Sequence, residues 1–319
     1  MRKHLIPLLC LCTLFALSFN AFGDEYPLAY YNFTDKNALS RGEVVVDAEW
    51  DFFWGKFVET DDYFTEPDCT VRLPGIWNSF ESLPPEAKKI AKSGRGSGTY
   101  RILLTGLKPN ASYSFFTYDL ASTAFEAYAD NKLIYKCGTP CEDWTKTKAQ
   151  SMMDLATFRT DLEGNVMITI YVSNNFYRKG GIWTQFKIQE EQAAYDWYNR
   201  RVSSSSLILA VFLTVVLYSF LVSFLKKDKA NLYLGLFAFA IFVRLLCSEF
   251  PMLKHFVPGV PYEIMLRLEF FALYTGPALY TLYLESLDAG AFGKIKGWWL
   301  ASPALVFLAA NILPIRAVS

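Results

Sequence analysis

Long apolar segments in the last third of the chain place the strongest limit on its fold. A helix that rises 1.5 Å per residue needs about 20 mostly apolar residues to cross a hydrocarbon layer about 30 Å thick. Four uncharged runs of 12 to 19 residues follow one another with short polar breaks: Leu207–Leu225, Leu232–Val243, Phe270–Leu284 and Trp298–Leu313. The sequence therefore predicts a transmembrane region over residues 206–319, with helices at about 206–225, 231–250, 262–286 and 298–315.

The N-terminus has the features of a secretory signal peptide. A basic stretch at residues 2–4 precedes the apolar run Leu5–Phe19, and Ala21 and Gly23 supply the small residues that a signal peptidase reads. Residues 1–23 are therefore predicted to be a signal peptide that exports the polar half of the chain. The apolar run is short, which favours a cleaved peptide over an anchor that stays in the membrane.

The charge balance excludes one large class of functions. The chain has 31 Lys and Arg against 31 Asp and Glu, which gives no electrostatic reason to expect nucleic-acid binding. After cleavage of the signal peptide, His255 would be the one imidazole left, and it is far from the cysteines in sequence. We therefore expect neither a metal site nor a cofactor.

Residues 24–188 have the pattern of β structure. Short stretches rich in β-branched and aromatic residues alternate with turn residues. The predicted strands contain Tyr100–Leu104, Ser112–Phe116, Phe125–Tyr128, Lys132–Tyr135, Asn165–Val172 and Trp183–Ile188. Many short strands with little helical periodicity favour an all-β antiparallel sandwich of the jelly-roll type. One helical turn is expected at Pro85–Ala91.

Residues 189–205 connect this predicted domain to the first membrane helix. Charged residues share the segment with Tyr195, Trp197 and Tyr198. Aromatic rings beside charges, just before an apolar span, are typical of the headgroup region. We interpret the segment as a juxtamembrane linker of helical character.

Basic residues between the apolar runs predict the orientation of the chain. If the β half is exported, the first helix brings the lysines at residues 226–229 into the cytoplasm, and the third helix does the same for Lys294 and Lys296. Cytoplasmic loops carry an excess of Lys and Arg. The signal peptide and the charge pattern therefore agree on an outer β domain.

Three charged residues interrupt the second and third membrane helices. Arg244 lies about two turns from the outer end of the second helix, and Arg267 and Glu269 lie at a similar depth on the third. A charge inside a membrane needs a partner or water. A short loop joins the two helices, so we predict an ion pair between Arg244 and Glu269. The alternative is that all three side chains extend to the outer headgroups.

Cys137 and Cys141 flank a Gly-Thr-Pro turn. Such a turn could bring the two sulfurs together in an oxidising compartment. Because pairing cannot be derived from sequence alone, a Cys137–Cys141 disulfide and an unbridged pair both remain open.

Motifs in both halves of the chain resemble one family of bacterial receptors. The outer half contains Trp50-Asp-Phe-Phe-Trp-Gly, Leu73-Pro-Gly-Ile-Trp-Asn, Gly96-Ser-Gly-Thr-Tyr-Arg and Val172-Ser-Asn-Asn-Phe-Tyr-Arg-Lys-Gly-Gly-Ile-Trp. The membrane half contains Asn231-Leu-Tyr-Leu-Gly-Leu-Phe and Leu266-Arg-Leu-Glu. Their order and spacing are similar to those of the seven-transmembrane receptors with diverse intracellular signalling modules. The resemblance covers nearly all of the chain after the signal peptide.

This resemblance implies a jelly-roll domain similar to galactose-binding modules, followed by seven helices and usually a cytoplasmic output domain such as a kinase or cyclase. The chain supplies four predicted helices and no output domain before Ser319, so the all-α bundle is incomplete. We expect a fragment of a longer receptor rather than a truncated gene. The resemblance also implies a multi-pass protein of the bacterial inner membrane with its N-terminal domain outside the cytoplasm.

The outer motifs are also similar to the sugar-binding domain of family-two glycoside hydrolases. A Pro-Gly-x-Trp-Asn piece and an Asn-Gly-Lys-like hairpin are framework elements there, and this chain has Asn131-Lys132 where the hairpin glycine would be. This second resemblance implies a carbohydrate-like ligand. Fold analogy alone does not identify the ligand.

Seven residues are candidates for ligand binding. The segment from Ser173 to Trp183 places amides, a guanidinium and an indole just past a strand end, where the loops of a sandwich commonly bind ligands. The candidates are Asn174, Asn175, Arg178, Trp183, Trp77, Asn78 and Arg101. A framework role is the alternative for each of them, and it is the stronger reading for Trp77 and Arg101.

The leading interpretation is a signal-transducing receptor whose outer domain senses a ligand and whose output module lies beyond residue 319. No catalytic residues are predicted, so we expect no enzyme activity. A membrane scaffold or protein-binding module is the alternative, and a tethered glycoside hydrolase is less favoured because no acidic pair stands out in the β half. The expected partners are a small polar or carbohydrate-like ligand and the membrane, with a homodimer left open.

Overall fold

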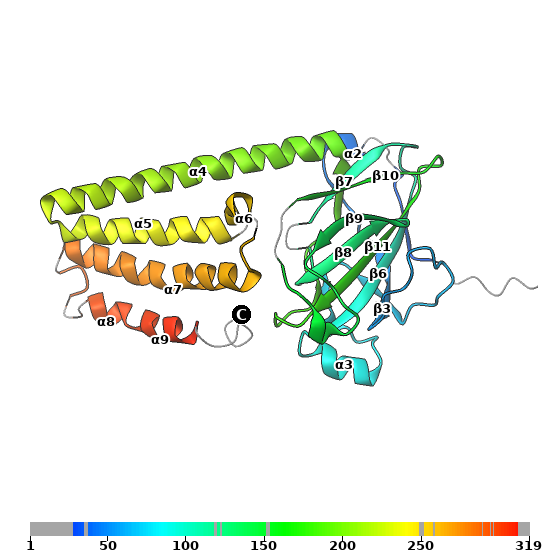
Figure 1. Cartoon of the computed structure of the whole chain (residues 1–319), viewed down its shortest axis with the longest axis horizontal. Coiled ribbons are helices and arrows are strands. Elements are labelled where there is room, and N and C mark those ends of the chain that lie inside the picture. Colours follow the sequence, from blue (N-terminus) through cyan, green and yellow to red (C-terminus); the bar gives the residue numbers. More distant parts are fainter. Residues whose placement is uncertain are drawn as a thin grey trace, which may run out of the picture.

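The computed structural model describes residues 28–34, 38–117, 120–121, 123–150, 154–248, 252–257, 259–288, 290–293, 295 and 297–311. The predicted signal peptide lies outside these residues. A β domain (residues 28–190) is followed by a helical part that begins at residue 191. In Figure 1 the helices lie side by side and extend away from one side of the β domain.

The β domain contains a large sheet with the strand order β4-β3-β6-β11-β8-β9, in which β1 also pairs with the end of β6. Its strands are β1 (Tyr30–Asn32), β3 (Glu49–Trp54), β4 (Cys69–Arg72), β6 (Gly96–Thr105), β8 (Ala124–Ala129), β9 (Lys132–Cys137) and β11 (Val166–Asn174). Every neighbouring pair is antiparallel except β1 with β6.

A second sheet has the order β10-β7-β13-β2 and is antiparallel throughout. Its strands are β2 (Val44–Val45), β7 (Ser112–Phe116), β10 (Leu155–Arg159) and β13 (Lys187–Glu190), and a separate pair is formed by β5 (Gly75–Ile76) and β12 (Gly181–Ile182). Short helical segments are α2 (Ala38–Arg41), α3 (Pro85–Ala91), η1 (Trp77–Ser79) and η2 (Trp144–Lys146). The helical turn predicted at Pro85–Ala91 is confirmed as α3. The last strand was predicted to begin at Trp183, but it begins at Lys187. The Trp183 N–H donates to the carbonyl of Leu120 and not to a neighbouring strand of the second sheet.

Alternating apolar side chains of the two sheets form one core. The large sheet contributes Tyr100 on β6 and Ile170 on β11 to this core, and the second sheet contributes Phe115 on β7. Phe186 connects them: its ring centroid lies 5.0 Å from that of Trp50 on β3 and 4.7 Å from that of Phe115. The predicted antiparallel β domain is therefore confirmed as two sheets around a shared core.

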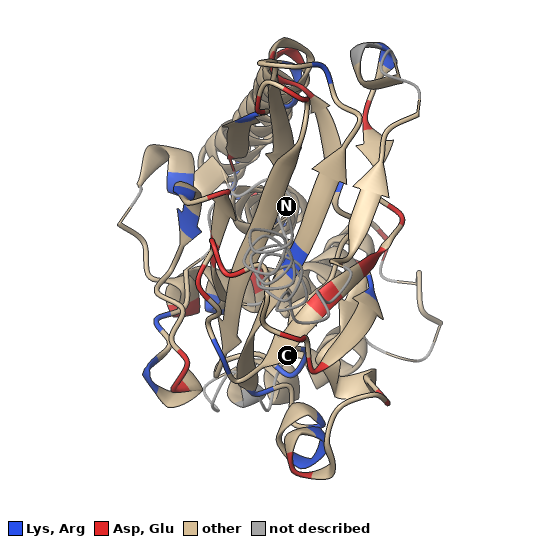
Figure 2. Cartoon of the chain, turned by 90° about the vertical axis from the view of Figure 1, so that its right-hand side faces the viewer, with Lys and Arg blue, Asp and Glu red and all other residues tan. Residues whose placement is uncertain are grey.

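Charged residues surround this core without forming a region of one sign. In Figure 2, blue and red residues are interspersed and lie mostly on the loops and strand ends of the β domain. This agrees with the equal numbers of basic and acidic residues in the sequence.

Helix α4 (Glu191–Lys226) begins directly after β13 and continues without a break for 36 residues, or about 54 Å. The predicted linker and the first predicted membrane helix are therefore parts of one helix. Many of its apolar side chains face outward, with Leu207 68% exposed, Leu217 62% and Phe224 82%. A core helix of a soluble protein would bury these side chains, so their exposure indicates a membrane environment.

The other helices lie in successive layers on one side of α4 (Figure 1). They are α5 (Lys229–Cys247), α6 (Met252–Phe256), α7 (Tyr262–Leu287), α8 (Gly297–Ala301) and α9 (Pro303–Ala310). Among the described residues, α4 and α5 are long and apolar enough to cross a membrane, judged by length and composition, and Gly297–Ala309 is a shorter apolar stretch. The fourth predicted helix is interrupted at Ser302, because the proline that follows has no backbone N–H to continue the hydrogen-bond ladder.

The ion pair expected between Arg244 and Glu269 stays a prediction. Arg244 lies on an exposed face of α5. On α7, Arg267 pairs with Glu263, at 2.7 Å between Nη2 and Oε1. Residues four apart on a helix are neighbours whatever the packing, so this local pair requires no contact between helices.

Candidate functional site

The segment from Ser173 to Trp183 is held together by Asn174, whose side chain is fully buried. Its Nδ2 donates to the carbonyl oxygens of Gly94 (2.7 Å), Tyr177 (2.8 Å) and Lys179 (3.2 Å). Its Oδ1 accepts from the hydroxyl of Thr123 (3.1 Å) and from the backbone N–H groups at 176 and 177. Both ends of the amide are therefore occupied by the protein, and the structure assigns Asn174 to the framework rather than to a ligand.

Trp77 and Asn78 fasten the same segment from the opposite side. The Trp77 indole N–H also donates to Gly94 O (3.0 Å), and the ring is fully buried. Asn78 Nδ2 donates to Arg178 O (2.9 Å), and its Oδ1 accepts from Gly180 N (3.0 Å). A Cβ at Gly180 would lie 1.9 Å from the Trp77 indole nitrogen, so this close approach requires glycine. The structure thus brings three predicted site residues together, but as a framework.

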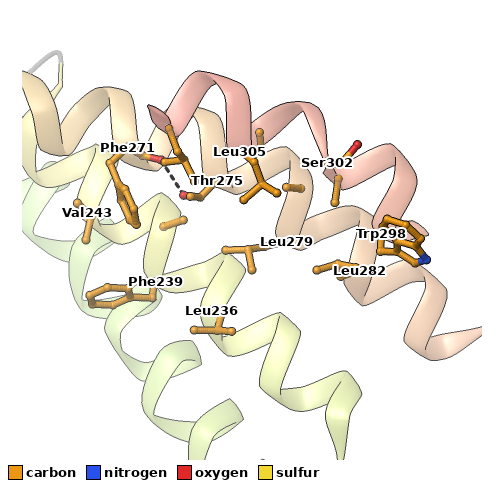
Figure 3. Close-up of a pocket in the computed structure, with 15 residues that line it drawn as sticks. Leu236, Phe239, Val243, Phe271, Thr275, Leu279, Leu282, Trp298, Ser302 and Leu305 are labelled. Atoms are coloured by element: carbon orange, nitrogen blue, oxygen red, sulfur yellow. Dashed lines mark hydrogen bonds between the residues drawn. The ribbon is translucent and has the colours of Figure 1, made fainter. Parts of the chain in front are cut away.

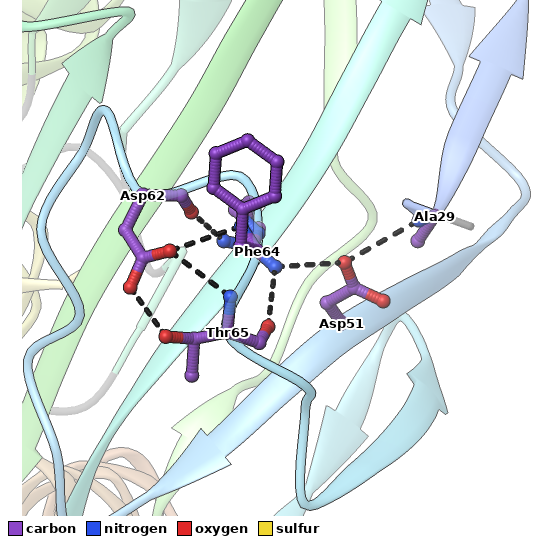
Figure 4. A network of polar contacts seen from close by, with 6 residues as sticks. Ala29, Asp51, Asp62, Phe64 and Thr65 are labelled. Carbon is purple, nitrogen blue, oxygen red and sulfur yellow. Dashed lines mark hydrogen bonds and ion pairs between the residues drawn. The ribbon is translucent and has the colours of Figure 1, made fainter. Parts of the chain in front are cut away.

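Arg101 is also buried, with 1% of its side chain exposed. It lies on the outer face of the large sheet, beneath the connection between β3 and β4 (residues 55–68, the β3–β4 segment). Its Nη2 lies 3.4 Å from Asp51 Oδ2 and 3.2 Å from Thr65 O, and its Nη1 donates to Asp62 O. Figure 4 shows Asp62 and Thr65 on this segment beside Asp51 on the sheet. The guanidinium therefore fastens the β3–β4 segment to the sheet.

Asp51 is the acidic partner in this contact. Burial raises the pKa of its carboxyl, and the hydrogen bond from Ala29 N and the charge of Arg101 oppose that rise. Its Oδ1 has no hydrogen-bond partner among the described residues. Because this acid is 1% exposed and already paired, it is not placed to act on a bound substrate.

The remaining predicted residues, Asn175, Arg178 and Trp183, reach the surface. Trp183 is half-buried, its ring lies 5.0 Å from that of Tyr177, and its indole N–H is buried without a partner in the described structure. Asn175 Nδ2 donates to Thr145 O at 3.4 Å, which connects the segment to η2. The candidate ligand surface is therefore the ring pair Tyr177–Trp183 with the Arg178 side chain. Tyr177 was missed from the sequence, although its position between Asn174 and Trp183 could have indicated it.

The described structure contains no disulfide between Cys137 and Cys141. Cys137 is buried, and its Sγ donates to Gln150 O at 3.2 Å, which gives the thiol a different partner. No group of three or more His, Cys, Asp or Glu able to hold a metal occurs among the described residues.

The helical part contains an apolar cavity of about 570 Å³ between α5, α7, α8 and α9. Figure 3 shows Phe239, Phe271 and Leu305 around it, one from each of three helices. Its two hydroxyl groups, on Thr275 and Ser302, donate to carbonyls of their own helices at 2.7 Å. This cavity suits apolar chains and offers little to a polar solute.

The β domain and the helical part meet along the start of α4, which lies against β7, β10 and β13. Ala194 is fully buried there, and the Trp197 ring lies 4.5 Å from that of Phe116 on β7. Lys108 Nζ lies 2.7 Å from Glu190 Oε1 at the end of β13. Lys254 on α6 is 8% exposed, and burial lowers the pKa of its ammonium group. The first turns of α4 are therefore fixed to the sheet by the packing of Ala194 and Trp197.

Comparison with solved structures gives partial matches to glycoside hydrolase enzymes. A GH2 β-galacturonidase from Eisenbergiella tayi is 13% identical over 46% of this chain and 24% of its own, with a TM-score of 0.31. The Faecalibacterium prausnitzii β-glucuronidase is 9% identical over 46% and 31%, with a TM-score of 0.33. The Parabacteroides merdae β-glucuronidase is 13% identical over 49% and 22%, with a TM-score of 0.31. The chain spans less than a third of the length of each enzyme, and their activities do not carry over to it.

Sequence comparisons concern the helical part. No curated protein matches the chain. Residues 203–318 match the family model described as 7TM diverse intracellular signalling. The apolar exposed face of α4 agrees with a membrane protein of this kind. The resemblance to the 7TM receptor family with diverse intracellular signalling, predicted from the motifs, is therefore confirmed over the helical part of the chain.

Proposed function

We propose that the chain is the sensing and membrane part of a signal-transducing receptor. The β domain binds a ligand, and the resulting movement passes along α4 to the helices that match the receptor family. The observation that carries this proposal is the direct continuation of β13 into α4, a single helix that reaches from the sheet into the apolar region. If this helix moves as one body, a shift at its first turn displaces its far end.

The contacts of α4 support this transmission. Near the sheet, Trp197 packs on Phe116. Farther along, Leu209 packs in an apolar cluster with Met252 of α6, and Tyr198, Val202 and Phe242 lie against it. A ligand that binds two arrangements of the β domain with different affinity would therefore shift the position of α4 against α5 and α6.

The ligand class we propose is a carbohydrate or a similar polar solute. Aromatic faces suit a sugar ring, and Tyr177 and Trp183 provide two, beside the charged hydrogen-bond donor Arg178. A jelly-roll arrangement of the β domain and its location outside the cytoplasm of a bacterial cell, with the helices in the inner membrane, belong to this proposal. No catalytic role is assigned to the chain.

A four-residue replacement in α4 tests the transmission. Ser203–Ser206 become four glycines in one variant and four alanines in its matched control. Four glycines disfavour the helix by about 4 kcal/mol relative to alanines, so they uncouple the two ends. Spin labels on Lys226→Cys and Leu287→Cys, in a background with the native cysteines replaced by alanine, measure the distance between the far ends of α4 and α7 in nanodiscs.

With the alanine control, we expect addition of a solute that binds the β domain to shift the label distance by about 1–2 Å, the size of helix shifts in allosteric transitions. The glycine variant should bind the same solute without the shift. Binding with no shift in the alanine control would contradict the receptor role and favour a membrane scaffold.

A further inference from the structure

A polar groove lies between the free edges of the two sheets. β9 is the last strand of the large sheet and β10 the last strand of the second sheet, and the two run beside each other. The groove between them has a volume of about 580 Å³. It begins near the turn that joins β8 to β9, whereas the Ser173–Trp183 segment follows the opposite end of β11. Met167, near the start of β11, contacts the β8–β9 turn, and Asn174 ends β11. The two residues are seven positions, or about 23 Å, apart along the strand.

The floor of this groove is apolar and its rim is polar. Ala129, Ile134 and Phe158 form apolar surface, whereas Lys132 and Arg159 place two cations on the rim beside the hydroxyl of Ser112 and the amide of Asn131. A pocket of this size, with a few polar groups around an apolar floor, is typical of small-molecule sites.

The rim is fixed before any ligand arrives. The β8–β9 turn is bound to β11 twice, because Asp130 N donates to Met167 O (2.7 Å) and Met167 N donates to Asp130 Oδ1 (2.9 Å). Asn131 accepts a hydrogen bond from the hydroxyl of Thr60 (3.0 Å). On the other side, Arg159 Nε donates to Asn110 O (3.0 Å). A site held in place by such contacts loses little entropy on binding.

The cations of this rim lack acidic partners within the described part of the chain. Several other cations of the β domain are paired, such as Lys136 with Glu126 and Lys108 with Glu190, both at 2.7 Å. Lys132 and Arg159 form no such pair. Asp130, the acid on the rim, has one of its oxygens engaged by the backbone. The groove therefore has an excess of positive charge and two groups that bind carboxylates well.

We propose that this groove binds a small organic acid that also carries hydroxyl groups, with its carboxylate between Lys132 and Arg159. The hydroxyl of Ser112 and the amide of Asn131 bind the hydroxyl groups, and the carbon skeleton covers Phe158. This site is separate from the Tyr177–Trp183 surface, and the proposal concerns binding alone. The groove lies one strand away from β13. Ser112 is the first residue of β7, β7 pairs with β13, and β13 leads directly into α4.

Calorimetric titration of the full chain in detergent tests the groove with pairs of probes that differ in the carboxylate. The pairs are D-glucuronate with D-glucose, D-galacturonate with D-galactose, and D-gluconate with D-glucitol. We expect at least one acid to bind in the micromolar to millimolar range while its neutral counterpart does not. Lys132→Ala and Arg159→Ala should each weaken that binding about ten- to a hundredfold. Added salt should weaken it as well, because the groove is open to solvent.

Lys136→Ala is the matched control, since this lysine lies on the same strand, is paired with Glu126 and does not line the groove. It should leave the affinity unchanged, and the thermal midpoint of each variant shows that it is folded. The proposal is overturned if none of the acids binds, if the neutral probes bind equally well, or if Lys132→Ala and Arg159→Ala bind as the unaltered chain does. Such a result leaves the spin-label test of the receptor role untouched, because that test uses any solute that binds the β domain.

Discussion

Arg101→Met is expected to lower the free energy of unfolding of the β domain by about 3–5 kcal/mol, which corresponds to about 10 °C in the thermal midpoint. The substitution leaves Asp51 as a buried carboxylate without its cation, and it removes the donors that bind Asp62 O and Thr65 O. The β3–β4 segment should detach from the sheet first. Thermal unfolding followed by circular dichroism measures the loss, and proteolysis within residues 55–68 measures the detachment.

A matched control uses the exposed pair Arg72–Asp47, whose Nε–Oδ1 distance is 2.7 Å and whose side chains are 67% and 60% exposed. Arg72→Met should change the thermal midpoint little, because water and salt replace an exposed partner. Equal losses for the two arginine variants would show that burial of Arg101 does not determine its contribution. The double variant Asp51→Leu with Arg101→Met should recover much of the stability, because no buried charge remains.

Asn174→Ala is expected to cost about 2–4 kcal/mol of stability, because it removes the partners of several buried backbone groups at once. The Ser173–Trp183 segment should become mobile, and hydrogen exchange of its amides should increase. Chemical denaturation of the full chain in detergent measures the first effect, and exchange followed by mass spectrometry measures the second.

The neighbouring Asn175→Ala serves as the control for this substitution. Asn175 is half-exposed and makes one long bond of 3.4 Å to Thr145 O, so its loss should cost little. Asn174→Asp keeps the acceptor oxygen but loses the donor to Gly94 O, and it should be destabilising as well. An Asn174→Ala variant as stable as the Asn175→Ala variant would contradict the framework role.

The helical part could be predicted from the sequence because its signal is local. The uncharged run Leu207–Leu225 lies within α4, and the run Leu232–Val243 lies within α5. Length and composition are sufficient for this prediction, since neither depends on a distant partner. The break at Ser302 lies directly before Pro303, and a proline can kink a membrane helix, so this irregularity also has a local cause. The Arg244–Glu269 pair could not be derived in the same way and stays a prediction, because the direction in which a side chain leaves its helix depends on how the helices pack.

The candidate site was harder to predict, because the groups that bind ligands also bind backbone carbonyls. An amide, an indole and a guanidinium were recognised at Asn174, Trp77 and Arg101. Asn174 and Trp77 both donate to Gly94 O, and Arg101 donates to Asp62 O, so these partners lie 17 to 80 residues away in the sequence. No local feature of the sequence distinguishes an amide side chain that faces water from one, such as that of Asn174, that donates to a carbonyl 80 residues earlier in the chain. The groove between β9 and β10 was missed for the same reason, because it exists only where two sheet edges meet.

Amide hydrogen exchange across residues 191–206, measured on the full chain in lipid nanodiscs, tests most directly whether the β domain and the membrane helices are joined by one rigid helix. The continuous α4 predicts slow exchange from the buried Ala194 through the four serines at 203–206, without a fast-exchanging interval before Leu207. Exchange of the serine amides at the rate of an unstructured chain would show a flexible linker between the two parts. That result would contradict transmission of movement along α4.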